Sequence, residues 1–230
     1  MYANANGGAG ASAGPEENPV LRAYNDWAGR TPFVTRCIMI TLAFSFILGL
    51  FVALDDKLSN NVHFTITQLE VYRVVTSGLY VTSLLSAVFG LMTFNSTGPR
   101  LEAALGSTGL MHLVLVIDVA GNLAFLALCS ARVMMGDITA RFASAAGFWN
   151  ILMALNAIEC MGAPEQPRKF MFFPCSLPSK FHPLMLYGLF CLFGGFRLDM
   201  GVYLALGYAY GAGKLDRLLK PPRARLEGWE

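Results

Sequence analysis

Apolar residues gather into several stretches of about 20 residues that hold few or no charges. A straight helix needs roughly 20 apolar residues to cross the ~30 Å hydrocarbon core of a bilayer. We therefore predict membrane spans at about 33–54, 77–94, 110–131 and 142–160, and two shorter ones within 183–213. One helix over the last stretch would bring Arg197 and Asp199 near the bilayer midplane, where charges are costly, so we divide it at Gly194-Gly195.

Polar segments separate and flank these spans. The run 95–100 contains Gly98-Pro99, which predicts a loop between the second and third spans. Residues 1–30 are rich in Gly, Ala and Asn and have no apolar core, so we expect a polar tail that is disordered in isolation and is no signal peptide. The predicted organisation is thus an N-terminal tail (1–30), a membrane domain (31–213) and a basic C-terminal tail (214–230).

Composition and charge agree with an integral membrane protein. Hydrophobic residues make up 55% of the chain, charged residues only 14%, and the mean hydropathy is +0.50. In a six-span arrangement both termini share one side, and more Lys and Arg lie on that side than on the other. Because positive loops tend to stay in the cytosol or the mitochondrial matrix, both termini are predicted to face that compartment.

The sequence offers little for cofactor or metal chemistry. It has three histidines, and its five cysteines are scattered without metal-ligand spacing, as buried free thiols are. No Gly-rich phosphate loop or nucleic-acid motif is visible. We therefore predict no cofactor, no metal and no nucleic-acid partner, and read the basic tail as a solvated segment that touches lipid headgroups.

Four short motifs between Gln68 and Gly213 carry a family resemblance. In chain order they are Tyr72-Arg73 leading into Thr76-Ser77, Gly98-x-x-Leu101-Glu102 followed by Gly106-Ser107, Gly147-Phe148-Trp149-Asn150, and Gly207-x-x-x-Gly211. In this order and spacing the chain resembles the rhomboid intramembrane proteases. The resemblance implies an all-α membrane protein with a six-helix rhomboid-like bundle, in which Tyr72, Arg73, Arg100, Glu102 and Gly106 belong to the fold motifs.

The same resemblance implies that the catalytic positions are vacant. Trp149 stands where rhomboids carry the nucleophilic serine, and Leu204 stands at the position of the histidine base. The oxyanion-stabilising side chains would fall near Val81, Ser86 and Gly90. Because an indole has no hydroxyl to attack a carbonyl, we expect a pseudoprotease and no enzyme.

Two sets of residues are predicted to shape the membrane domain. Gly207 and Gly211, four residues apart, would let span six pack closely against span four. Arg100 and Glu102 would organise the turn between spans two and three through hydrogen bonds to backbone groups. Both roles are structural.

An acidic group inside a predicted span is unusual. Asp118 lies near the middle of span three, with Asn122 one helical turn later, and Asn150 and Asn156 are candidate neighbours on span four. A carboxylate in lipid is costly and should face the bundle. Two interpretations stay open. The first is a polar cavity that admits a client helix or a proton. The second is a hydrogen-bonded core cluster.

Fold alone does not choose between functions. The first hypothesis is a non-enzymatic structural or interaction subunit of a larger organellar membrane complex, with other membrane subunits and lipids as partners. The alternative is a derlin-like pseudoprotease that handles clients in membrane quality control. The short tail after Gly213 leaves no room for an appended ubiquitin-binding domain, which favours the first. We prefer the mitochondrial inner membrane over the endoplasmic reticulum.

Overall fold

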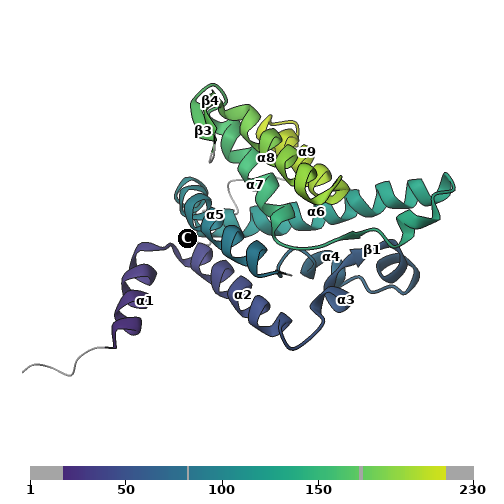
Figure 1. Cartoon of the computed structure of the whole chain (residues 1–230), viewed down its shortest axis with the longest axis horizontal. Helices are drawn as coiled ribbons and strands as arrows, with labels where there is room; N and C mark the ends of the chain where they lie inside the picture. Colours follow the sequence, from purple (N-terminus) through teal and green to yellow (C-terminus); the bar gives the residue numbers. More distant parts are fainter. Residues whose placement is uncertain (1–17, 82, 171–172, 216–230) are drawn as a thin grey trace, which may run out of the picture.

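The computed structural model describes residues 18–81, 83–170 and 173–215, which form a mostly helical, all-α protein (Figure 1). Its α-helices are α1 (Pro19–Arg30), α2 (Phe33–Gly49), α3 (Leu54–Leu58), α4 (Arg73–Thr76), α5 (Leu84–Leu105), α6 (Ser107–Met134), α7 (Trp149–Gly162), α8 (His182–Gly194) and α9 (Leu198–Gly211). Short helical turns are η1 (His63–Thr67), η2 (Ile138–Arg141) and η3 (Ser179–Phe181). Two antiparallel pairs join β1 (Asn60–Asn61) to β2 (Ser144–Ala145) and β3 (Pro167–Phe170) to β4 (Phe173–Pro178).

An α-helix lies at each of the six predicted spans, namely α2, α5, α6, α7, α8 and α9. The predicted break near residue 195 is confirmed: α8 ends at Gly194, and Gly195 has a φ of 77°, which glycine adopts without strain. Within the described residues, α6 is the one helix that is both long and apolar enough to cross a membrane, judged by length and composition. The apolar helix α2 is shorter.

The predicted loop at 95–100 is wrong, because α5 continues through it to Leu105 with Pro99 inside the helix. A proline removes one backbone hydrogen bond, which normally weakens a helix. However, Gly98 lies so close to α2 that a Cβ there would come within 2.7 Å of the Thr35 Cγ2. This close packing of α5 on α2 outweighs the tendency of Gly98-Pro99 to interrupt the helix. The chain turns instead at Gly106, whose φ is 76°.

Other helix bounds also differ from the prediction. α2 ends at Gly49, α5 begins at Leu84 instead of 77, and α7 begins at Trp149 instead of 142. The segments before α5 and α7 lie side by side, where the Gly147 N–H donates to the Ser77 carbonyl (2.8 Å) and the Phe148 N–H to the Tyr80 carbonyl (3.1 Å). Backbone groups that would otherwise extend each helix are thus paired between the two segments.

The expectation of a disordered tail over 1–30 is wrong for its last part, where residues 19–30 form α1. The Asn18 side chain caps this helix by accepting a hydrogen bond from the Val20 N–H (3.1 Å). Pro19 begins the helix, at a position where no backbone donor is required. Residues 1–17 and 216–230 lie outside the described residues, so the predictions for both extreme tails remain predictions.

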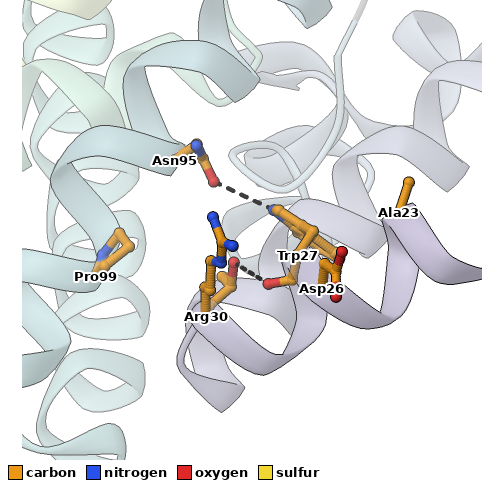
Figure 2. Close-up of a pocket in the computed structure, with 7 residues that line it drawn as sticks. Ala23, Asp26, Trp27, Arg30, Asn95 and Pro99 are labelled. Atoms are coloured by element: carbon orange, nitrogen blue, oxygen red, sulfur yellow. Dashed lines mark hydrogen bonds between the residues drawn. The ribbon is translucent and has the colours of Figure 1, made fainter.

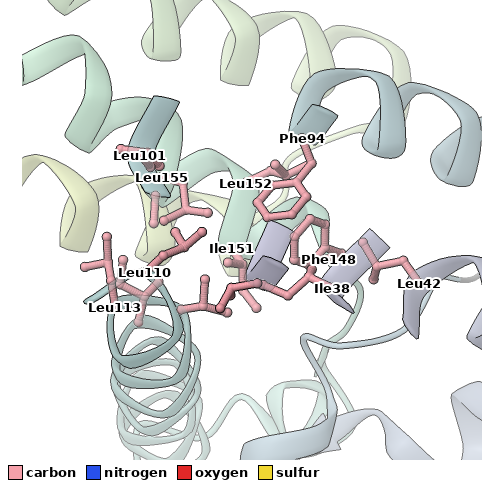
Figure 3. Packing of buried hydrophobic residues seen from close by; sticks show 14 of the residues in the cluster. Ile38, Leu42, Phe94, Leu101, Leu110, Leu113, Phe148, Ile151, Leu152 and Leu155 are labelled. Atoms are coloured by element: carbon pink, nitrogen blue, oxygen red, sulfur yellow. The ribbon is translucent and has the colours of Figure 1, made fainter. Parts of the chain in front are cut away.

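The main hydrophobic core lies where α2, α5, α6 and α7 meet (Figure 3). Its buried side chains include Ile38, Leu42, Phe94, Leu101, Leu110, Leu113, Phe148, Ile151, Leu152 and Leu155. Phe94 and Phe148 meet edge to face, with ring centroids 5.1 Å apart. A second cluster forms beside the C-terminal half of α6 and comprises Val62, Val74, Phe125, Leu126, Cys129 and Ala145.

Two glycines set the close approach of α9 to α7, the most extensive helix contact among the described residues. A Cβ on Gly207 would lie 2.5 Å from the Ala154 carbonyl oxygen and 2.7 Å from its Cα. A Cβ on Gly211 would lie 2.6 Å from the Met161 Cβ. The backbones of the two helices therefore touch at Gly207, and any larger residue there would separate them.

Gly207→Ala is expected to lower the free energy of unfolding by about 1–3 kcal/mol, because the added methyl group overpacks this contact. Gly188→Ala in α8 is the matched control, since nothing lies within 4 Å of a Cβ at that position. The control is expected to be neutral or to stabilise by about 0.5–1 kcal/mol through helix propensity. Denaturant unfolding in mixed micelles measures both variants, and equal effects would contradict the close contact.

Candidate functional site

Trp149, which the predicted resemblance places at a serine position, is an indole packed between two helices. Trp149 begins α7, and its N–H donates to the Ser86 carbonyl in the first turn of α5 (3.2 Å). The ring lies against Phe190 of α8, with centroids 4.8 Å apart. A Cβ on Gly90 would lie 3.6 Å from the indole nitrogen. The tryptophan therefore fills the space beside Ser86 and Gly90, two positions at which the resemblance places oxyanion-stabilising groups.

Leu204, which the predicted resemblance places at the position of a histidine base, is apolar. Leu204 is buried on α9. The histidines of the chain lie on other elements: His63 in η1 contacts Arg141 (3.2 Å), His182 at the start of α8 contacts Asn156 (3.4 Å), and His112 lies on α6. An indole and an isobutyl group supply neither a nucleophile nor a base for acyl transfer.

Buried polar side chains gather around Asn122 on α6. Its amide nitrogen donates to the Asp118 Oδ1 and to the Val74 carbonyl, both at 2.9 Å. Its amide oxygen accepts from the Asn60 amide (2.8 Å) and the Ser77 hydroxyl (3.0 Å). Asn122 thus makes four hydrogen bonds and joins α6 to the chain segment 60–77. We call this group the Asn122 cluster, comprising Asn60, Thr65, Ser77, Asp118, Asn122 and Tyr203.

Asp118 is fully buried in this cluster, and within the described residues it forms no ion pair. The Tyr203 hydroxyl from α9 lies 3.2 Å from its Oδ1 and 3.1 Å from its carbonyl oxygen. Gly78 lies directly against the carboxyl group, so that any Cβ there would collide with it. The Asp118 Oδ2 is buried and has no hydrogen-bond partner in the described part of the chain. These contacts favour the interpretation of a hydrogen-bonded core cluster.

The two candidate neighbours on span four, Asn150 and Asn156, form no hydrogen bond with Asp118 in the described structure. Asn156 contacts His182 and accepts from the Cys160 thiol (3.6 Å). The Asn150 Oδ1 is buried without a partner among the described residues. Asp118 bonds instead to Asn122, one turn later on the same helix, and to Tyr203 from α9. The sequence did not indicate Tyr203, nor the partners that the 60–77 segment supplies to Asn122. One signal in the sequence was Gly121, which has no side chain and lies next to Asn122. A Cβ at this position would lie 2.5 Å from the Tyr203 ring, so the glycine leaves space for that ring.

Tyr72 and Arg73 hold the segment that carries Asn60 and Ser77. The buried Arg73 guanidinium donates to the Ser59 carbonyl (2.9 Å) and pairs with Glu70. It also lies 4.5 Å from the centre of the Phe64 ring. The Tyr72 hydroxyl, on the exposed side, donates to the Lys57 carbonyl (3.1 Å). These contacts fold the segment back over α6.

Glu102 joins the ends of three helices. Its carboxylate accepts from the Val34 and Thr35 N–H groups (2.9 and 2.8 Å) at the start of α2, from the Thr35 hydroxyl (2.7 Å), and from the Ser107 hydroxyl at the start of α6 (2.6 Å). Burial raises the pKa of Glu102, but these hydrogen bonds together hold it below its ordinary value. Arg100 is exposed and pairs with Glu159 (3.1 Å). The carboxylate therefore organises a helix junction wider than the turn that the sequence indicated.

Comparison with known proteins adds no family to this picture. No protein-family model matches the chain, and no curated protein matches it significantly. Within the described residues, no group of three or more His, Cys, Asp or Glu side chains is placed to hold a metal ion.

Proposed function

We propose that this chain is a catalytically inactive, rhomboid-like protein of six membrane spans that serves as a structural and interaction subunit of a larger organellar membrane complex. The observation that carries the proposal is the packing of Trp149 against Ser86, Gly90 and Phe190. A bulky ring packed between α5, α7 and α8 supplies no catalytic group and makes the bundle more rigid. The mitochondrial inner membrane is our preferred location.

Exposed apolar side chains support the membrane assignment. Large ones lie along α2 and α5, including Phe44, Ile47, Leu85 and Met92. Exposed apolar surface of this kind is uncommon on soluble monomers. Lipid or neighbouring membrane subunits would cover it.

The buried polar groups support a rigid role. The Asn122 cluster ties α6 to α9 and to the 60–77 segment, and Glu102 ties α2 to α5 and α6. The Asn122 amide and the Glu102 carboxylate each make four hydrogen bonds, and groups bonded in this way hold their helices in a fixed arrangement, which suits a packing surface for other subunits.

One observation favours the alternative of a client-handling pseudoprotease. The Asp118 Oδ2 and the Asn150 Oδ1 are buried without hydrogen-bond partners among the described residues. A polar group on a client helix would satisfy either atom, and an unpaired polar atom inside a membrane protein marks a functional position. This second candidate keeps the same inactive fold.

Native gel electrophoresis after solubilisation of native membranes in mild detergent separates the two candidates. A scaffold subunit is expected to migrate entirely with one large assembly, at a fixed ratio to its other chains. Transient, substoichiometric binding to degradation components would instead identify a client handler. If the purified protein cleaved a labelled transmembrane substrate, both candidates would be wrong.

A further inference from the structure

Helix α1 stands apart from the helical bundle and has no buried residue (Figure 1). Val20, Leu21 and Tyr24 are exposed along one face, Val20 to 74%. Arg22 and Asp26 project from the other side of the helix, as their spacing requires, whereas Asn25 follows Leu21 by one turn and lies at the border between the two sides. The helix is therefore amphipathic, and its apolar face is uncovered in the described structure.

The apolar face of α1 lies beside the start of the first predicted span. Only Thr31 and Pro32 separate Arg30 from Phe33, so the end of α1 lies within about 11 Å of the start of α2. Two hydrogen bonds add to this tether, from the Trp27 indole to Asn95 of α5 (3.4 Å; Figure 2) and from Arg36 of α2 to the Ala28 carbonyl (3.0 Å). Phe33 is itself exposed at the start of α2.

We propose that α1 lies in the headgroup layer of the membrane, with Val20, Leu21 and Tyr24 buried in phospholipid. This inference rests on the proposed membrane function. If α2 crosses the bilayer, the short tether keeps α1 at the surface from which α2 enters. At this surface the apolar acyl chains and the polar headgroups lie within the width of one helix.

The side chains of α1 match that environment. Tyr24 and Trp27 are amphipathic aromatics of the kind that gathers at the boundary between water and lipid. Arg22 and Arg30 supply cations for lipid phosphates, and Asp26 is the single acidic residue of the helix. A hollow between α1 and α5 is lined by Asp26, Trp27, Arg30 and Asn95, so it has one acidic and one basic side chain in its wall (Figure 2).

Photocrosslinking in native membranes tests this placement. The photoreactive residue p-benzoylphenylalanine is introduced at Leu21, at Asp26 on the opposite face, or at Phe44 on the exposed side of α2, and the adducts are identified by mass spectrometry after irradiation. We expect lipid adducts at Leu21 and Phe44, and at least fivefold fewer at Asp26.

The Phe44 position keeps this inference separable from the proposed function. Lipid adducts at Phe44 without an excess at Leu21 over Asp26 would overturn the placement of α1 alone. Adducts at Leu21 to another protein chain, or to a second copy of this one, would also overturn it and would identify a protein partner. Absence of lipid adducts at both Leu21 and Phe44 would contradict the membrane assignment itself.

Discussion

Replacing Asn122 with leucine is expected to lower the free energy of unfolding by about 3–5 kcal/mol, because a buried donor or acceptor left without a partner costs roughly 1–3 kcal/mol. The substitution removes four hydrogen bonds and leaves Asn60, Ser77 and the Val74 carbonyl without this partner. Leucine has the same branching and the same number of side-chain heavy atoms as asparagine and is somewhat larger, so the substitution leaves no cavity. Denaturant titration in mixed micelles, followed by circular dichroism, measures it.

Leu123→Ala is the control for this variant, because Leu123 follows on the same helix and is exposed. A change within about 0.5 kcal/mol is expected there, as for most exposed positions. If Asn122→Leu cost no more than the control, the Asn122 cluster would have no role in stability.

Glu102→Ala is expected to cost a similar amount, about 3–5 kcal/mol, because hydrogen bonds to a charged group contribute roughly 1.5–3 kcal/mol each and are only partly replaced by water. The variant leaves the Val34 and Thr35 N–H groups at the buried start of α2 without an acceptor. It also frees the Ser107 hydroxyl at the start of α6. Arg100→Ala serves as the control, since the Arg100 side chain is 55% exposed and its ion pair with Glu159 should contribute only about 1 kcal/mol.

The lowered pKa of Glu102 gives this prediction a pH dependence. A carboxyl group whose pKa is lower in the folded state than its ordinary value of 4.5 stabilises the protein above that value. This stabilisation is lost as the pH falls below 4.5 and then through the lower pKa that Glu102 has in the folded state. The wild-type protein should therefore lose more stability between pH 6 and pH 3 than Glu102→Ala does. Parallel curves for the two proteins over this range would show that the carboxylate is not held in this way.

The helices themselves followed from local patterns. The lengths of the apolar runs located α2, α5, α6, α7, α8 and α9, and Gly194-Gly195 located the break between the last two. Local signals failed where packing outweighed them. Gly98-Pro99 normally interrupts a helix, but contact with Thr35 carries α5 past it.

The candidate site was only partly visible in the sequence. Trp149, Leu204 and Asp118 were recognisable because each is an unusual residue for its position. Their surroundings were not, since Tyr203 lies 85 residues from Asp118 and Asn60 lies 62 residues from Asn122. No periodicity links positions so far apart.

The sequence alone therefore determined where apolar helices form, because this depends on the identity and spacing of nearby residues. Only the tertiary structure decided that the indole of Trp149 rests on Ser86 and Gly90, that Asn122 bonds to Asn60 and Ser77, and that Glu102 joins three helix ends. Hydrogen bonds and ring contacts act over a few ångströms. Their partners are chosen by how whole helices pack, and a linear pattern does not carry that information.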